Sequence, residues 1–504
     1  MTGERLSFGR GRHAGHWRVA VVQYFARIAI TVFACAYLTI DFAPSAYALP
    51  SFARQTGQPC GSCHTDFAGL TPYGRRFKIG GYTFGGGQYR TALFPSADDS
   101  SDNAKKKWVP PISMMTIVGF TNTQVAQPPP TAPYSTNNNT VVSPVSFFWG
   151  GAITDHLGAF AQMTYNAPPL GGFGADPFGH TWTWDNTDVR YADSTSIGKL
   201  SITYGITANN NPTVQDPWNT TPAWAFPYAS STVAPTPGSH TIIDGTLAAH
   251  VASVGVYADF NDLLYLEATA YHTLDPSTQN ALGTDPFGAP GMSTVSPYWR
   301  AAIEPHWGNH WLEVGTFGMV SGIHPWAAPP AGAGTPLPLP AVTTVTFPQT
   351  DKFTDIGFDS QYQYQGDNYW FTLRGTYIHE YQKLDASFPN GLSSNPTNDL
   401  NEAKGYASLA YGSNNRVVLT GQYFNTWGTP DPLLYGSLAS AFSPNGSGWI
   451  AEIAYIPFIS STAPGWPWLN MRIGLQHTWY QRFDGTSVGA ANNNTTFLYL
   501  WLAM

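Results

Sequence analysis

From residue 112 onward, apolar and polar positions alternate in segments of about ten residues that are separated by turns and loops. Leu264, Leu266 and Ala268 share one parity of such a segment, whereas Tyr265 and Glu267 share the other. A period of two is typical of a β-strand whose two faces meet different surroundings. The pattern predicts sixteen strands, at residues 112–123, 144–153, 157–166, 182–192, 197–207, 249–259, 263–273, 297–306, 310–320, 353–364, 368–382, 403–412, 415–426, 447–457, 467–480 and 495–504.

The connections between these strands follow a rule. Within hairpins the turns are tight, as at residues 261–262, 366–367 and 413–414, whereas long stretches rich in Gly, Pro, Ser and Asn, such as 208–248, separate the hairpins. Short turns that alternate with long loops, together with an even strand count, are typical of a bacterial outer-membrane barrel. The sequence therefore predicts an all-β, 16-stranded, porin-like barrel in outer-membrane lipid. A soluble sandwich or propeller, the alternative, would lack the asymmetry.

Charged residues fall on one parity of the predicted strands. Asp188 and Arg190 share a face, as do Arg300 and Glu304, and Arg374 lies between two outward-facing apolar positions. A Lys or Arg on the lipid face costs about 2–4 kcal/mol at mid-depth. We therefore expect these side chains to face the lumen, where they pair across it or tune an aqueous channel of the width that sixteen strands enclose.

Composition agrees with a membrane barrel. Of the 504 residues only 11% are charged, whereas 15% are aromatic, and ordinary soluble domains are about 25% charged. Residues 1–48 are predicted to be an export signal, with a basic beginning, an apolar stretch at 28–40 and a small-x-small site ending at Ala48. A retained N-terminal anchor is the alternative. Cleavage removes Cys35 and leaves Cys60 and Cys63 as the only cysteines.

The run CGSCH at residues 60–64 has the Cys-x-x-Cys-His pattern of c-type haem attachment. Its spacing allows Cys60 and Cys63 to bind the two vinyl groups of one haem, and it brings His64 beneath the iron as the proximal ligand. A thioredoxin-like dithiol or half of a zinc site would need a βαβ context or a second ligand pair, and neither is visible. One covalently attached haem c is therefore predicted.

The second axial ligand of the iron is not given by the motif. Met115 is a candidate because it lies near the start of the first strand and shares the more polar face with Ser113, Gly119 and Thr121. Simple packing of Met115, a distal histidine or an open coordination position are the alternatives.

Charge is distributed unevenly between the two ends of the predicted barrel. The eight long loops contain no Lys or Arg. Their aspartates are Asp176, Asp216, Asp244, Asp275, Asp285, Asp351, Asp385, Asp399, Asp431 and Asp484. A surface with carboxylates and no basic groups is expected to concentrate cations. Basic residues gather instead around the haem motif, namely Arg54, Arg75, Arg76, Lys78, Arg90 and Lys105 to Lys107. These are expected to neutralise haem propionates, to dock an acidic partner or to keep a linker solvated.

Residues 50–57 (PSFARQTG), 60–64 (CGSCH) and 70–78 (LTPYGRRFK), followed by Gly81-Tyr82, resemble the fused monohaem cytochrome–porins of the outer membrane. This family includes ferrous-iron oxidases. Gly69 departs from the family's usual proline, and the chain ends in Met504 where barrels commonly end in Phe. The resemblance implies a signal peptide at 1–48, a monohaem cytochrome segment at 49–84, a linker at 85–111 and a barrel at 112–504.

The resemblance also implies extracellular electron transfer. In such proteins the haem accepts an electron from Fe(II) and passes it to a periplasmic electron-transfer protein, with the haem segment at the periplasmic side or within the lumen. An enzyme of this kind would be an Fe(II):cytochrome c oxidoreductase without a catalytic acid, base or nucleophile. The alternatives are a conduit for another extracellular donor, and a diffusion porin in which a haem-bearing segment plugs the pore. No nucleic-acid partner is expected.

Overall fold

The computed structural model describes residues 50–66, 68–94, 105–127, 134–165, 180–221, 225–284, 291–325, 349–436 and 442–504. The predicted export signal with Cys35 lies outside these ranges, as do Asp176 and Asp285.

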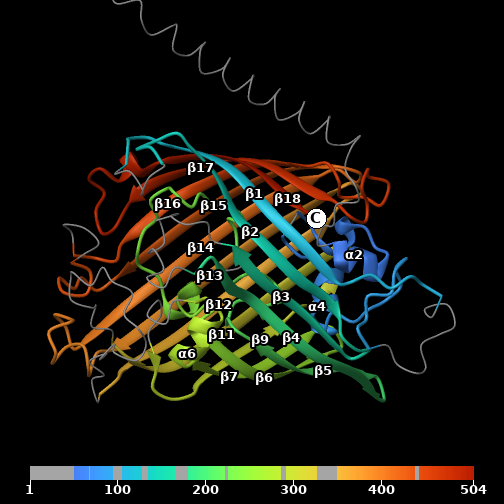
Figure 1. Ribbon diagram of the computed structural model, residues 1–504. Helices are drawn as coiled ribbons and strands as arrows, with labels where there is room; N and C mark the ends of the chain where they lie inside the picture. Colours follow the sequence, from blue (N-terminus) through green and yellow to red (C-terminus); the bar gives the residue numbers. More distant parts are fainter. Residues whose placement is uncertain are drawn as a thin grey trace, which may run out of the picture. The chain divides into compact units, whose positions relative to one another are not determined.

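The described strands form one antiparallel barrel (Figure 1). It closes because β1 pairs with both β2 and β18, the last strand of the chain, with Met115 opposite Ala503 in the second pair. The long strands are β1 (Ile112–Thr123), β2 (Asn139–Ala152), β3 (Leu157–Tyr165), β4 (Trp182–Ile197), β5 (Leu200–Asn209), β6 (Val251–Phe260), β7 (Leu264–Thr273), β9 (Ser296–Ile303), β11 (His310–His324), β12 (Asp351–Gln365), β13 (Tyr369–Lys383), β14 (Thr397–Tyr411), β15 (Arg416–Gly428), β16 (Gly446–Ile456), β17 (Asn470–Arg482) and β18 (Thr495–Ala503).

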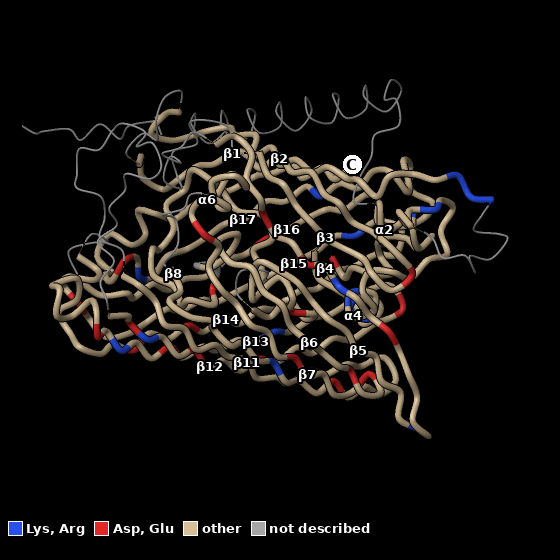
Figure 2. The backbone as a smooth tube through the Cα atoms, turned by 60° about the horizontal axis from the view of Figure 1, so that its bottom comes forward, with Lys and Arg blue, Asp and Glu red and all other residues tan. Residues whose placement is uncertain are grey.

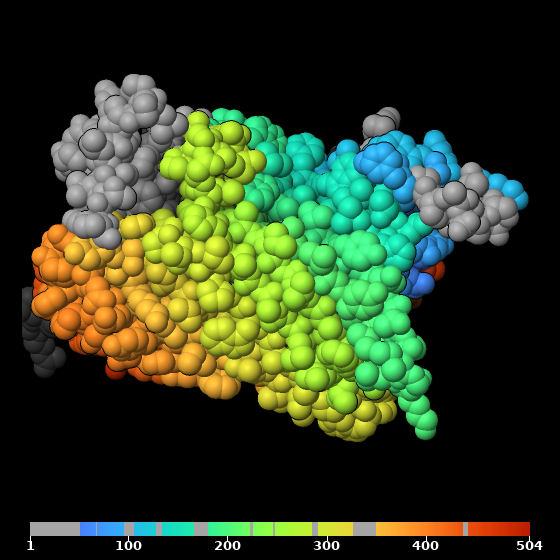
Figure 3. Space-filling view, turned by 90° about the horizontal axis from the view of Figure 1, so that it is seen from below, coloured from blue at the N-terminus to red at the C-terminus, as the bar shows by residue number. Residues whose placement is uncertain are grey.

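The prediction of a 16-stranded barrel is confirmed. The sequence did not predict two further two-residue strands, β8 (Gly291–Met292) and β10 (His306–Trp307), which pair with β11 at its two ends. Several strands run past their predicted ends because backbone pairing continues where the apolar alternation has stopped; β14, for example, begins at Thr397 rather than 403. The β4–β5 hairpin projects at the short-turn end (Figures 1 and 3), and Ile197 at its tip is 68% exposed.

The two faces of the wall differ as the alternation predicts. The exposed face carries apolar side chains such as Val254, Phe358 and Leu419, whereas Arg190 and Arg300 are fully buried on the inner face. Acidic and basic positions are interspersed along the strands (Figure 2). Apolar residues outside and charges inside are typical of a barrel that spans the outer membrane, so the chain is an outer-membrane protein.

Among the described residues, none of the helices combines the length and the apolar character that a membrane crossing requires, a result that says nothing about a barrel.

Two segments of the described chain occupy part of the lumen, so the width that sixteen strands enclose is not left empty. One filling is the N-terminal segment 50–94. The other is residues 210–247 between β5 and β6, named here the inserted loop, which the sequence analysis placed outside. Arg300 of β9 pairs with Asp216 of this loop, and Arg374 of β13 donates a hydrogen bond to its Tyr228. The loop leaves the wall between β5 and β6 and also contacts Gln476 of β17, which donates to Ala229 O, and Thr121 of β1, which lies 2.7 Å from the Ser231 hydroxyl, so it crosses the lumen.

Replacing Leu419 with arginine tests the orientation of the wall. Leu419 is 51% exposed on β15, and we expect Leu419→Arg to lower the free energy of unfolding by about 2–4 kcal/mol because the charge meets lipid. Urea-induced unfolding in lipid vesicles measures this change. Asn414→Arg, in an exposed short turn, is the matched control; a similar loss for both variants would contradict the assignment of the lipid face.

Candidate functional site

The predicted haem segment forms three short helices at the short-turn end of the barrel (Figure 1). They are α2 (Pro50–Thr56), α3 (Cys60–Cys63) and α4 (Pro72–Ile79). Thr71 caps α4 by accepting a hydrogen bond from Gly74 N, and Pro72 follows in the first turn, where no backbone N–H is needed. Phe77 packs between Phe52 and Tyr82, at 5.1 and 6.0 Å between ring centroids. This aromatic cluster holds α2 against α4.

The predicted attachment residues lie on one tight turn. Cys60 and Cys63 begin and end α3, and the His64 N–H donates to Cys60 O at 2.9 Å. Three residues of separation in a helical turn place both thiols on the same side, and the two are free of each other. Burial raises the pKa of Cys60 to about 11 and that of Cys63 to about 12. Both are therefore protonated thiols at neutral pH.

Burial also lowers the pKa of His64, so this imidazole is neutral at pH 7. Neutral imidazole is the form that ligates a metal. Two unlinked thiols on one side of a turn, followed directly by a partly buried neutral histidine, form the donor set that a covalently attached haem requires. The residues present therefore fit a c-type haem. Cys60 and Cys63 would hold the porphyrin, and His64 would supply the axial nitrogen.

The basic residues near the motif attach the segment to the wall and the inserted loop. Arg75 is buried and pairs with Glu304 at 2.5 Å, Lys78 donates to Val214 O and Asp216 O, and Arg54 donates to Ile112 O. The interpretation of these three as solvating a linker is wrong. Arg76, half-exposed, pairs with Asp262 at 3.0 Å, and Lys105 and Lys107 lie at the surface.

The inner wall also reaches the backbone around His64. Arg416 of β15 donates to His64 O and Thr65 O, at 2.5 and 2.7 Å, and Gly61 N donates to Ile459 O at 3.0 Å. Asp66 lies 3.6 Å from Arg472 of β17. The sequence analysis missed Arg416, Arg472 and Asp66. The alternation along the strands could have placed the two arginines on the inner face of the barrel. It could not have identified the residues that they contact.

Gly69 stands where the family named in the sequence analysis usually has proline, and the local hydrogen bonds of this chain require the glycine. The Gly69 N–H donates to Asp66 Oδ1 at 2.8 Å, and proline has no such donor. A Cβ at this position would lie 2.5 Å from the same oxygen. The departure is therefore matched to the local fold of residues 65–70.

Replacing Gly74 with alanine tests the packing of α4 on the attachment turn. A Cβ at Gly74 would lie 2.3 Å from the backbone oxygen of Cys63, so Gly74→Ala has to push α4 away from the turn. We expect a loss of about 1–3 kcal/mol in local stability, measured as faster proteolysis within residues 50–90 of the assembled barrel. Gly85→Ala is the control because a Cβ there meets only Thr83 O at 3.9 Å. Equal proteolysis of both variants would contradict this packing.

Met115 lies on β1, on the same parity as the buried Ser113 and Ile117. It is opposite Ala503 of β18, which in turn is opposite Asn470 of β17. The Asn470 side chain lies beside the Cys60 thiol. Met115 is therefore two strands from a residue that touches the attachment turn, and its role as distal ligand stays a prediction.

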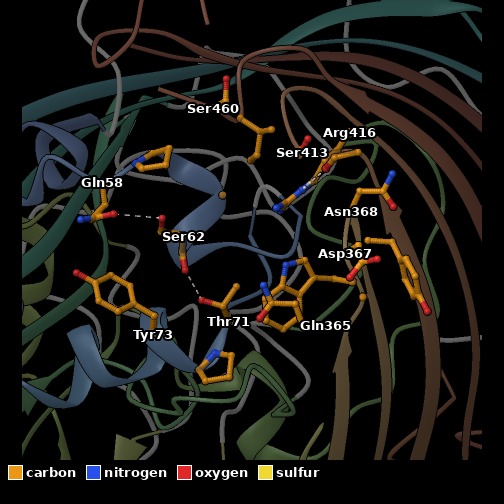
Figure 4. Close-up of a pocket in the computed structure, with 18 of the residues that line it drawn as sticks. Gln58, Ser62, Thr71, Tyr73, Gln365, Asp367, Asn368, Ser413, Arg416 and Ser460 are labelled. Atoms are coloured by element: carbon orange, nitrogen blue, oxygen red, sulfur yellow. Dashed lines mark hydrogen bonds between the residues drawn. The ribbon is translucent and has the colours of Figure 1, made fainter. Parts of the chain in front are cut away.

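A cavity of about 710 Å³ borders the attachment turn on the side of the short turns (Figure 4). Gln58, Ser62 and Tyr73 of the N-terminal segment face Asp367 and Arg416 of the wall across it. The wall contributes the short turns at 366–368, 412–413 and 459–461. The cavity thus lies at the end of the barrel where the short turns gather.

The expectation that the long-loop aspartates form an open cation-gathering surface is wrong for four of them. Asp216 is fully buried and lies 3.4 Å from Arg300, and Asp244 pairs with Lys404 at 3.0 Å. Asp351 accepts hydrogen bonds from Ala386 and Ser387, and Asp431 accepts them from Ser394 and Leu433. These carboxylates hold loops in place. Asp275, by contrast, is exposed and caps the short helix α6 (Pro276–Ala281).

No protein-family model and no curated protein sequence matches the chain. Solved structures that resemble it include OmpF of Salmonella typhi in complex with daunomycin, at 13% identity and a TM-score of 0.43, covering 78% of this chain and 97% of that one. OmpT of Vibrio cholerae has 9% identity and a TM-score of 0.39, with coverage of 78% and 96%. OprB of Pseudomonas putida has 9% identity and a TM-score of 0.41, with coverage of 78% and 93%. Likeness at this level adds nothing beyond the fold, and the closed 16-stranded barrel itself fits an outer-membrane porin.

Proposed function

We propose that this protein is an outer-membrane c-type cytochrome–porin that moves electrons from an extracellular donor, Fe(II), to a periplasmic electron-transfer protein. The observation that carries the proposal is the position of the Cys60–His64 turn. The turn lies in the lumen against the inner face of the wall, close to the short-turn end. It is held there by the hydrogen bond that Arg416 donates to His64 O and the one that Gly61 N donates to Ile459 O. A haem motif on a free linker would need no such attachment.

The chain's residues supply the setting for one-electron chemistry. Cys60 and Cys63 anchor a haem, which when bound accepts and releases one electron without a change in covalent structure. His64 would supply a nitrogen ligand to the iron. Axial ligation, burial and nearby charge are the means by which a protein tunes such a centre. No proton-transfer residue is required.

The outer half of the lumen offers a place for the donor. A cavity of about 230 Å³ lies between the inserted loop and strands β14 to β18, and its lining includes Asp244, Glu402 and Lys404. Asp244 and Lys404 form an ion pair at 3.0 Å, and Glu402 accepts a hydrogen bond from Thr241 at 2.9 Å. The lining of this cavity inside the lumen is therefore polar, which suits a small hydrated ion such as Fe(II).

The short-turn end offers the exit. In an outer-membrane barrel the short turns face the periplasm, and the 710 Å³ cavity opens beside Gly61 and Ser62 of the attachment turn. A periplasmic electron acceptor can therefore approach the turn without crossing the inserted loop. Donor and acceptor reach it from opposite sides of the membrane.

Anaerobic stopped-flow mixing of the purified ferric protein with Fe(II) tests this proposal. We expect the haem absorption bands to change to those of the ferrous form, with a rate that rises with Fe(II) concentration. Zn(II), a divalent cation without accessible redox chemistry, is the control and leaves the spectrum ferric. A haem that stays ferric with Fe(II) at both acid and neutral pH would exclude Fe(II) as the donor.

A further inference from the structure

The three residues that follow the second cysteine are held from the barrel wall by two arginines. Arg416 begins β15, and Arg472 is the third residue of β17, so both belong to the rigid wall near the short-turn end. Their partners are His64, Thr65 and Asp66. Two strands therefore fix the stretch of chain that carries the axial histidine.

Arg416 acts on the backbone of this stretch. Its Nη1 donates to His64 O at 2.5 Å and Thr65 O at 2.7 Å, and its Nε donates to Gly412 O at 3.1 Å in the adjoining turn. A Cβ at Gly61 would lie 3.1 Å from Arg416 Nη2. The guanidinium thus lies against the attachment turn itself. Among the described residues Arg416 makes no ion pair. Its positive charge beside the attachment turn is therefore not offset by a carboxylate at ion-pair distance.

Arg472 acts on the side chain of Asp66. The two are 3.6 Å apart, and both are at most 1% exposed. Arg472 is itself fixed by an ion pair with Glu452 and by a hydrogen bond from its Nε to Tyr499 OH at 2.8 Å. Asp66 Oδ1 accepts from Gly69 N. The wall therefore sets the position of Asp66, and Asp66 sets the fold of the residues just after His64.

We propose that Arg416 and Arg472 are positioning residues for the axial histidine, which fix the His64 imidazole and keep positive charge beside the haem. The inference rests on the proposed function, since it concerns the group that Cys60, Cys63 and His64 would hold. A fixed axial ligand gives one ligand geometry, and a nearby cation favours the reduced, less positive iron. Arg416 meets backbone oxygens, so its charge is less offset than that of Arg472, which faces Asp66 and Glu452.

Substitution of each arginine in the full-length holoprotein tests the proposal. We expect Arg416→Gln and Arg472→Gln to retain covalently bound haem on denaturing gels, because the covalent bonds would form at Cys60 and Cys63, which neither substitution changes. Electron paramagnetic resonance of the ferric protein is expected to change from one haem signal to several. The midpoint potential is expected to fall for Arg416→Gln and to change less for Arg416→Lys, which keeps the charge.

Arg300→Lys is the matched control. Arg300 is an equally buried lumen arginine, but its ion-pair partners are Asp216, Glu313 and Asp359 rather than the haem segment. It is expected to leave the resonance signal and the potential unchanged. If a glutamine variant does not assemble, the resonance signals of Arg416→Lys and Arg472→Lys test the proposal instead. These variants keep the charge but change the contact geometry, so several signals are still expected.

Wild-type signals and potentials in every assembled Arg416 and Arg472 variant would overturn the proposal. A change of equal size in Arg300→Lys would also overturn it, because the effect would then belong to the barrel in general. Absence of bound porphyrin in the wild-type protein is a different result: it would refute the proposed function itself.

Discussion

Replacement of both Cys60 and Cys63 by alanine is expected to give a barrel that assembles in the outer membrane and contains no covalently bound porphyrin. The two thiols are the only attachment points that the mature chain offers, so the loss should be complete. The barrel does not depend on them, because its closure is made by backbone pairing of β1 with β2 and β18. Intact-mass spectrometry of the purified protein measures the porphyrin, and the gel shift on heating measures assembly.

Cys35→Ala is the matched control, since Cys35 lies in the predicted export signal and is removed with it. The mature Cys35→Ala protein should have the same mass and the same bound porphyrin as the wild type. A wild-type mass that corresponds to the unmodified mature chain would end the haem proposal. Porphyrin that persists in the double variant would show that attachment uses other residues.

Replacement of the inserted loop, residues 212–246, by a short Gly-Ser linker is expected to increase single-channel conductance at least several-fold. A barrel of sixteen strands is wide enough for an aqueous channel, and here the loop crosses that space. Its links to the wall include Arg300 with Asp216, Thr241 with Glu402, and the Ile242 N–H with Glu380. Planar-bilayer recordings of the wild type and the variant measure the difference.

Shortening the loop at 385–395 is the control, because its contacts include Asp351 at the start of β12 and Asp431 of another long loop. Its conductance should stay at the wild-type level. A wild-type protein with the conductance of an open porin would contradict the filled lumen. That result would favour the alternative function, diffusion through a pore that carries a haem-bearing segment.

The strands were predictable because each depends on a pattern that is local in the chain. A strand in a membrane barrel has lipid on one side and the lumen on the other, so Leu266 and Glu267 must alternate wherever the chain crosses. The Cys-x-x-Cys-His pattern was recognisable for a similar reason, because Cys60, Cys63 and His64 lie within a single turn. Such local features can be recognised in the sequence without knowledge of the rest of the fold.

The contents of the lumen were not predictable. The inserted loop has the Thr-, Asn- and Pro-rich composition of the loops outside the barrel, and polar residues suit both water and a charged inner wall. What distinguishes it is the set of partners, such as Asp216 with Arg300 and Thr220 with Asp359. These pairs join residues far apart in the chain. The same holds for Asp244, which the sequence analysis assigned to the surface and which pairs with Lys404.

The sequence by itself determined that this chain forms a barrel and that a Cys-x-x-Cys-His pattern precedes the first strand, because alternation and motif spacing are imposed within a few residues. Only the tertiary structure decided where the motif lies and what surrounds it. Arg416 reaches His64 across 352 positions, and a contact of that range exists only after the wall has closed. The environment of the candidate haem site is therefore a property of the assembled barrel.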